Sequence, residues 1–356
     1  MWKFCKGGVS MILSIESSCD DSSLALTRIA DYKLLFHTKL SQDSHHSPFG
    51  GVVPEIASRL HAQNLPMLLE KIKDFLCATY NTRTPFAPLK AIAIANRPGL
   101  SVTLSEGMCM ANALALSLEI PLLCLNHLKG HIYSLFIDKP TQIGEGLGVL
   151  LVSGGHTQIL HIRDYHHITL VAQSLDDSFG ESFDKVAKML SLGYPGGPIV
   201  ESYAKNYSGT LLPMPIPLLH DKRLAYSFSG LKNAVRLEIA KTQDNLSKEQ
   251  ICASFQEAAC THILHKLRIY FQQYSDSFTH FGVVGGASAN TLLRTKIESL
   301  CQEFDKTLLL APLEFCADNA AMIGRLACEA YAHKEFSPLS DTISPKSFPE
   351  DFYKDC

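Results

Sequence analysis

The sequence of 356 residues lacks several features that would assign it to a class at once. No apolar run approaches the roughly 18 residues that a membrane-spanning helix needs. Basic and acidic residues nearly balance, at 32 against 35, so the chain is not a strongly basic nucleic-acid coat protein, although a local basic patch remains compatible with RNA binding. Hydrophobic residues make up 46% and charged residues 19%, which excludes a disordered chain and leaves a globular protein of one large or two ordinary domains.

The eleven cysteines form no C-x-x-C pair, which argues against a zinc ribbon and a thioredoxin-like motif. They are odd in number and scattered, as is typical of a reducing compartment, so we expect a cytoplasmic protein without a membrane partner. The run MILSI is too short for a signal peptide, and no A-x-A site follows it. We therefore expect residues 1–10 to be an extension that adds nothing to the fold.

Segments typical of strands and of helices alternate along the chain, which indicates the α/β class. The segments MILSI and LALTRI favour a hairpin around a polar turn, and VLLVSGGHTQILHI repeats this pattern. Leu151 lies 136 residues after Ile15. The repetition favours two similar domains from a duplication, with two unrelated hairpins as the alternative.

The motif His127-x-x-x-His131 could bind a metal ion. Residues i and i+4 of a helix project from one face, so two imidazoles can share one ion. The motif has no Glu after His127 and is therefore not the H-E-x-x-H of zinc proteases. A carboxylate commonly completes such a site, and Asp318, before the last predicted helix, is a candidate. The alternative is an incidental pair of histidines.

Three loops of small residues could approach phosphate groups closely. They are residues 17–23, residues 153–157 (SGGHT) and residues 285–290 (GGASAN), and each follows a predicted strand. Ordinary turns remain the alternative reading, and none of the three matches a Walker A or G-x-G-x-x-G motif. The carboxylates Asp177, Glu181 and Asp184 share a helical face, which favours a solvated face, with one ligand-binding member as the alternative.

Eight motifs in this order resemble the TsaD family of tRNA threonylcarbamoyladenosine synthases, earlier described as O-sialoglycoprotein endopeptidases. They are IESSCDDSS, GGVVPEIASRLHAQNL, RPGL through PLLCLNHLKGHIYS, LLVSGGHTQIL, LDDSFGESFDKVAKMLSLGYPGGP, SFSGLKNAV, GGASAN and CADNAAMIG. The resemblance spans residues 11–331. It implies the actin-like and sugar-kinase-like (ASKHA) fold of two RNase-H-like lobes. We expect a first lobe at 11–145, a second at 146–335 whose C-terminal helix packs back towards the first, and a flexible tail at 336–356.

The resemblance also implies an activity. A family member transfers the threonylcarbamoyl group of threonylcarbamoyl-AMP to N6 of the adenosine at position 37, in tRNAs that read codons beginning with A, and AMP leaves. The metal ligands of the family correspond to His127, His131 and Asp318. They imply one divalent ion per subunit, with Fe(II) favoured and Zn(II) also suited. The substrate-binding positions of the family correspond to Leu151, Val152, Ser153, Gly154, Gly155, Asp184, Gly197, Glu201 and Asn290.

Two motifs depart from the family pattern. Arg97 stands where the family has Gly, and an Arg adopts a positive φ only at a cost, so that loop could differ. The chain has C-A-D-N-A-A-M-I-G instead of C-T-D-N-G-A-M-I-A, so Ala320 replaces a Gly at the start of the last helix.

No residue is assigned as a catalytic acid or base, and Glu16, Asp20 and His156 are candidates for a base. The expected partners are tRNA, threonylcarbamoyl-AMP, a TsaB-type paralogue and a TsaE-type ATPase. The candidate tRNA contacts are Arg59, Lys129, Arg223 and Lys232. The alternatives are an ATP-dependent kinase or ATPase of the same fold, the metalloprotease of the earlier description, and a non-catalytic partner protein.

Overall fold

The fold is that of a computed structural model, which describes residues 9–141, 143–242 and 247–347. The chain divides into two compact units. The described residues of Met1–Gln42, Val52–Gln142 and Asp318–Asp351 form the first unit, and those of Asp43–Gly51 and Ile143–Ala317 form the second. The expectation for residues 1–10 falls mostly on residues 1–8, which lie outside the described part of the chain.

The first unit is built on a five-stranded mixed sheet. Its strands are β1 (Met11–Glu16), β2 (Asp21–Arg28), β3 (Leu34–Ser41), β4 (Leu89–Arg97) and β5 (Leu122–Asn126). Their order in the sheet is β3-β2-β1-β4-β5. The first three strands are antiparallel neighbours, as expected for the hairpin of residues 11–29, and β4 and β5 run parallel to β1.

The sheet of the second unit repeats this topology. Its strands are β6 (Leu147–Val152), β7 (Thr157–Ile162), β8 (Ile168–Gln173), β9 (His280–Val284) and β10 (Thr307–Leu310). The order β10-β9-β6-β7-β8 is that of the first sheet, with the same antiparallel and parallel pairs. The duplication and the ASKHA class, with two RNase-H-like lobes, are therefore confirmed.

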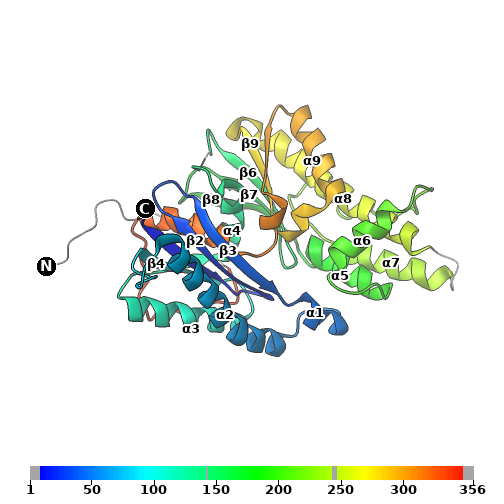
Figure 1. The fold of residues 1–356 in the computed structure, drawn as a ribbon. Coiled ribbons are helices and arrows are strands. Elements are labelled where there is room, and N and C mark those ends of the chain that lie inside the picture. Colours follow the sequence, from blue (N-terminus) through cyan, green and yellow to red (C-terminus); the bar gives the residue numbers. More distant parts are fainter. Residues whose placement is uncertain (1–8, 142, 243–246, 348–356) are drawn as a thin grey trace. The chain divides into compact units, whose positions relative to one another are not determined.

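Helices cover both faces of the first sheet. They are α2 (Pro54–Tyr80), α3 (Ser101–Leu118), α4 (His127–Tyr133) and α10 (Ala320–Ala332). In Figure 1, α2 and α3 lie side by side beneath the strands. Leu13 and Ile15 of β1 pack on this pair, while Ser14 faces α10, because alternate residues of a strand point to opposite faces. The last helix, which we expected at the end of the second lobe to pack back towards the first, lies in the first unit.

The helices of the second unit enclose an aromatic core. They are α5 (Phe179–Met189), α6 (Gly196–Lys205), α7 (Ser229–Thr242), α8 (Lys248–Tyr274) and α9 (Thr291–Glu303), and the short helix α1 (Asp43–His46) belongs to the same unit. Phe183 of α5 meets Phe255 of α8 edge to face, and Phe179 meets Phe228 in the same way. Among the described residues, no helix combines the length and apolar character that a membrane span requires.

The start of α10 packs closely on β1 and β2, which bears on the departure at Ala320. Ala320 is fully buried, its amide donates to the Ser23 hydroxyl at 3.0 Å, and its carbonyl accepts from Ser14 at 2.7 Å. One turn later a Cβ on Gly324 would collide with the Thr27 hydroxyl and lie 2.8 Å from that of Ser14. The chain thus has Ala and Gly where the family has Gly and Ala, and only the second position requires glycine here.

We predict that Gly324→Ala lowers the free energy of unfolding by about 1–2 kcal/mol, because an added methyl group overpacks the contact between α10 and the strands. The gain in helix propensity offsets only part of this loss. Gly230→Ala is a matched control, since a Cβ at Gly230 in α7 meets open space. Urea unfolding of both variants checks the prediction, and equal stabilities would contradict it.

The segment after α10 is more ordered than expected. We expected a flexible tail at 336–356, but residues up to Ser347 bind the edge of the first sheet. The Ser337 amide donates to the Leu122 carbonyl, and the Ser337 hydroxyl accepts from the Cys124 amide. The side-chain amide of Asn96 donates to the Thr342 carbonyl. The segment thereby satisfies backbone groups of the edge strand β5 and the backbone carbonyl of Asn96 in β4, which explains the order. Residues 348–356 lie outside the described part of the chain.

The departure at Arg97 carries no cost in backbone conformation. Arg97 is the last residue of β4 and is not among the residues with positive φ. Its guanidinium pairs with Asp341 of the C-terminal segment at 3.7 Å. The close approach lies at Gly99 instead, where a Cβ would lie 2.6 Å from the carbonyl oxygen of Ser18.

A buried histidine in the second unit should make stability depend on pH. His262 of α8 is fully buried and accepts a hydrogen bond from the Ser227 amide. Burial, with Lys266 and His265 nearby, lowers its pKa from 6.5 to about 4. Between these values the unfolded chain binds the extra proton, so stability is full above pH 6.5 and falls towards pH 4.

The full shift corresponds to roughly 3 kcal/mol. We predict that His262→Gln flattens this dependence, because the glutamine oxygen can still accept from Ser227 but does not titrate. Urea unfolding across this pH range compares the variant with the wild type. Equal slopes in the two proteins would show that other groups cause the acid sensitivity.

Candidate metal and nucleotide sites

The metal motif lies on the short helix α4, directly after β5. Asn126 caps the helix: its side-chain oxygen accepts from the amides of Leu128 and Lys129 at 2.8 and 3.2 Å. The helix therefore begins at His127, and His131 lies one turn later on the same face. The two imidazole rings are 4.7 Å apart between centroids and nearly perpendicular.

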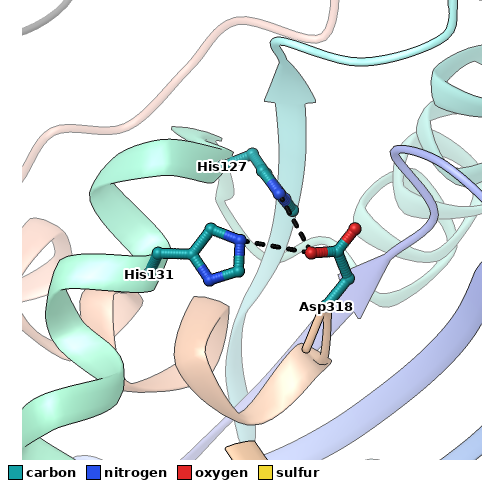
Figure 2. Close-up of side chains that lie close together, drawn as sticks. All are labelled: His127, His131 and Asp318. Carbon is teal, nitrogen blue, oxygen red and sulfur yellow. Dashed lines mark ion pairs between the residues drawn. The ribbon is translucent and has the colours of Figure 1, made fainter. Parts of the chain in front are cut away.

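Gly130, between the two histidines, allows the segment that carries Asp318 to approach α4. A Cβ at Gly130 would lie 2.7 Å from the Cδ1 atom of Ile323 in α10, so any larger residue would push the two helices apart. Asp318 precedes α10 and reaches both rings. Its Oδ1 atom lies 3.3 Å from Nε2 of His127 and 3.2 Å from Nε2 of His131, as the dashed lines in Figure 2 show.

A second carboxylate contacts the His127 ring at Nδ1, the nitrogen that does not face Asp318. Glu16, at the end of β1, is fully buried, and its Oε2 atom lies 2.9 Å from Nδ1 of His127. Its other oxygen accepts from the Ser18 amide at 2.7 Å, and the Ser18 hydroxyl lies 3.1 Å from the same Nδ1 atom. A carboxylate at Nδ1 holds the proton there and leaves the Nε2 lone pair directed at the site. Sequence reasoning offered Glu16 only as a base and missed this contact.

The electrostatics give the three residues different charge states. Burial alone would raise the pKa of Asp318, but His127 and His131 outweigh it and hold that pKa well below its ordinary value. Burial would lower the pKa of His127, yet Glu16 and Asp318 raise it well above its usual range. Burial lowers the pKa of His131, which is therefore neutral. The group thus holds one carboxylate anion and at least one neutral imidazole.

The three residues fit a divalent metal ion. Their ligand atoms all lie within 4.8 Å of one another. Within the described ranges, Nδ1 of the fully buried His131 has no hydrogen-bond partner, and Nε2 faces Asp318 at 3.2 Å without regular hydrogen-bond geometry, which is costly unless something else binds there. Two imidazoles and one carboxylate are a ligand set that suits Fe(II) and Zn(II). The thiol of the nearby Cys19 is a poor further ligand, because burial and the neighbouring carboxylates raise its pKa well above its usual value.

The predicted substrate loop lies in the second unit, at the end of β6. The side chains of Leu151 and Val152 are fully buried, so only their backbone could contact a ligand. Gly154 and Gly155 are exposed, and a Cβ on either would meet nothing within 4 Å. The Ser178 hydroxyl, at the start of α5, donates to the Gly154 carbonyl at 2.6 Å. The loop therefore exposes its backbone at Gly154 and Gly155, and the hydrogen bond from Ser178 holds this backbone in place.

Glycines bring two further elements against this loop. A Cβ on Gly180 in α5 would collide with the Ser153 carbonyl, and one on Gly285 after β9 would collide with the Val152 carbonyl. Gly285 has a φ of 91°, which glycine adopts without strain. The structure thus places the end of β6, the start of α5 and the turn after β9 in contact. Of the predicted residues, Ser153, Gly154 and Gly155 belong to this group.

Asp184 and Gly197 lie where α5 approaches α6. The Oδ1 atom of Asp184 accepts from the Gly196 amide at 2.7 Å, at the first residue of α6. A Cβ on Gly196 would lie 2.6 Å from the Cα atom of Asp184, whereas one on Gly197 would meet open space. Asp184 therefore supports the helix start, and Gly197 leaves the backbone beside it accessible.

Glu201 and Asn290 meet at the start of α9. The Glu201 carboxylate accepts from the Thr291 amide at 2.9 Å and from its hydroxyl, and pairs with Lys205. Burial would raise the pKa of Glu201, but these partners lower it. The Asn290 amide donates to Gln256 at 2.9 Å, and its oxygen caps α9 through the Leu293 amide. Both predicted ligand groups thus have structural partners.

The remaining candidates are two carboxylates near the start of α5, the candidate tRNA contacts and the candidate catalytic bases. Asp177 pairs with Lys185 and Lys232 at 2.6 and 2.7 Å, and Asp176 accepts from the first residues of α7, so both join helices. Lys232, a candidate tRNA contact, is thereby engaged, as is Arg223 by Asp221. Arg59 is exposed on α2, and Lys129 is half-buried on α4. Nothing in the structure singles out Asp20 or His156 as a base.

Comparisons with known proteins fit this geometry. A family model described as tRNA N6-adenosine threonylcarbamoyltransferase matches residues 33–325. A protein of that name from Helicobacter hepaticus is 58% identical, over 96% of this chain and all of its own length. One from Helicobacter pylori strain G27 is 59% identical with the same coverage, and one from Wolinella succinogenes is 58% identical over 95% of this chain and 99% of its own.

Two solved structures share the fold at low identity. HypF from T. kodakarensis has a TM-score of 0.54 at 12% identity, covering 91% of this chain and 48% of its own. Full-length HypF in a phosphate- and nucleotide-bound form has a TM-score of 0.59 at 14% identity, covering 93% of this chain and 57% of its own. These likenesses concern the fold alone. The full-length matches above establish the family: the chain belongs to the tRNA N6-adenosine threonylcarbamoyltransferases.

Proposed function

We propose that this protein transfers the threonylcarbamoyl group of threonylcarbamoyl-AMP to N6 of the adenosine at position 37, in tRNAs that read codons beginning with A. The observation that carries the proposal is identity of 58–59% over nearly the whole chain with proteins named for this transfer. The His127, His131 and Asp318 cluster accompanies it. The kinase and metalloprotease alternatives are not favoured, since none of these relatives bears such a name.

The first unit would contribute a metal centre. His127, His131 and Asp318 would hold one divalent ion, for which we favour Fe(II), with Zn(II) as the alternative. When bound, such an ion supplies Lewis-acid polarisation of a substrate oxygen. Glu16 would keep the His127 ring in its ligating tautomer. Because Glu16 is fully buried and already engaged, it serves better as a positioning residue than as a base.

The second unit would bind the adenylate. The open backbone at Gly154, Gly155 and Gly197 would approach phosphate and ribose oxygens without side-chain interference. Asp184, Glu201 and Asn290 would hold the helix starts that border this backbone. The adenine N6 atom of the tRNA is a weak nucleophile, so positioning should supply much of the rate. Asp20 and His156 remain the candidates for a proton acceptor.

The proposed partners beyond tRNA are a TsaB-type paralogue and a TsaE-type ATPase, and they follow from the family resemblance. Among the four candidate tRNA contacts, we favour Arg59, because it is exposed on α2, whereas Arg223 and Lys232 already pair with aspartates and Lys129 is half-buried on α4. An exposed cation can neutralise an RNA phosphate.

Depletion of the protein in its own cells tests the function. Total tRNA is digested, and threonylcarbamoyladenosine is quantified by mass spectrometry beside unrelated modified nucleosides. We expect only the threonylcarbamoyl nucleoside to fall, and to recover with a wild-type copy. An unchanged level would overturn the proposal, and ATP turnover with small-molecule acceptors would then test the kinase alternative.

A further inference from the structure

The turn that carries Asp318 lacks the hydrogen bonds of regular structure. Helix α10 begins at Ala320 with Asn319 as its N-cap, so the Asp318 carbonyl precedes the first intrahelical acceptor. That carbonyl accepts instead from the ammonium group of Lys39, at 3.2 Å. The metal-facing carboxylate of the same residue thus depends on a backbone that a side chain from β3 holds.

Lys39 is itself fixed by a partner on the neighbouring strand. Its ammonium lies 2.5 Å from Oδ2 of Asp21 in β2, and both side chains are largely covered, with 27% and 14% of their surface exposed. A covered pair with two defined acceptors loses less to solvent than an exposed pair. Lys39 therefore presents its ammonium to Asp318 in one arrangement.

The same face of the β2–β3 hairpin also binds Ala320, two residues after Asp318. Lys39 lies opposite Ser23 in the β2–β3 ladder, so the two side chains share a face with Asp21. The Ser23 hydroxyl accepts from the Ala320 amide at 3.0 Å. One hairpin face thus holds the backbone on both sides of Asn319, immediately after the ligand.

We infer that Lys39, anchored by Asp21, is a positioning residue that fixes the Asp318 carboxylate for metal binding. This inference rests on the metal centre of the proposed function and adds residues that the spacing of the ligands does not reveal. Loss of an outer partner of a metal ligand typically weakens metal binding by 10–100-fold.

Metal binding by the purified full chain tests the inference without any activity assay. Zn(II) affinity is measured by competition with a chromophoric chelator, and the visible spectrum of the Co(II) form reports the ligand geometry. We expect Lys39→Met to weaken Zn(II) binding by about 10–100-fold and to alter the Co(II) spectrum. Lys39→Arg should recover most of the affinity, because it keeps a charged donor.

Lys33→Met is the matched control. Lys33 precedes β3 and pairs with Asp138 at 3.2 Å, but this pair is exposed and does not contact the Asp318 turn. We expect its metal affinity to equal that of the wild type. Asp21→Asn should weaken binding less than Lys39→Met, and the double variant should lose less than the sum of the two, because both act through one contact.

The outcomes separate this inference from the proposed function. Wild-type affinity and spectrum in Lys39→Met would overturn the positioning role, whatever the tRNA nucleosides show. A raised KM for threonylcarbamoyl-AMP with unchanged metal affinity would also overturn it, and would assign Lys39 to substrate. A wild-type chain that binds no metal would overturn it together with the metal centre. If Lys39→Met does not fold, Asp21→Asn carries the test, since it releases the anchor alone.

Discussion

Replacement of His131 by alanine should abolish metal binding and reduce threonylcarbamoyl transfer to background. His131 is fully buried, and its Nε2 atom faces the Asp318 carboxylate at 3.2 Å without forming a regular hydrogen bond. Its removal leaves one imidazole and one carboxylate, which is too few to hold the ion. Loss of a direct ligand should exceed the 10–100-fold cost of losing an outer partner, so we expect affinity to fall by more than about 100-fold.

Metal content of the purified protein and transfer to unmodified tRNA are measured together. His167→Ala is the control, because His167 is exposed in the second unit and its ring pairs with Asp164. The control should retain both properties. Full transfer by His131→Ala would show that the reaction does not need the metal, even if the family function itself is confirmed.

The second large effect is expected at Glu16. Glu16→Gln keeps the size of the side chain but removes the charge that faces Nδ1 of His127. Without that charge the ring no longer favours the tautomer whose Nε2 lone pair faces the site, so metal affinity should fall by about 10–100-fold. Transfer measured at saturating metal should recover in large part, because the ligands themselves remain.

Glu106→Gln provides the comparison for Glu16→Gln. Glu106 lies on α3 in the same unit, accepts a hydrogen bond from Ser58 and does not contact the metal ligands. It should leave metal affinity unchanged. If Glu16→Gln instead abolished transfer while leaving metal affinity intact, Glu16 would be the proton acceptor and the positioning role would be wrong.

Much of the fold could be predicted because its signals are local. Alternating and continuous apolar runs marked the hairpin of β1 and β2 and that of β6 and β7, and the repetition of this pattern indicated the duplicated sheet. The C-terminal segment was misjudged because its Ser, Pro and Asp content is typical of mobile tails. Its order comes from hydrogen bonds to the edge strand β5 and to Asn96 of β4, which composition does not reveal.

The sequence by itself determined the two-histidine face of the metal cluster, because the i, i+4 spacing is a property of any helix. The sequence also showed that glycine-rich loops follow predicted strands. Only the tertiary structure decided that Asp318 reaches both rings, since this requires α10 to approach α4 across Gly130. The roles of Glu16 and Lys39 likewise depend on side chains far apart in the chain that meet where strands and helix starts pack, and no local pattern encodes such meetings.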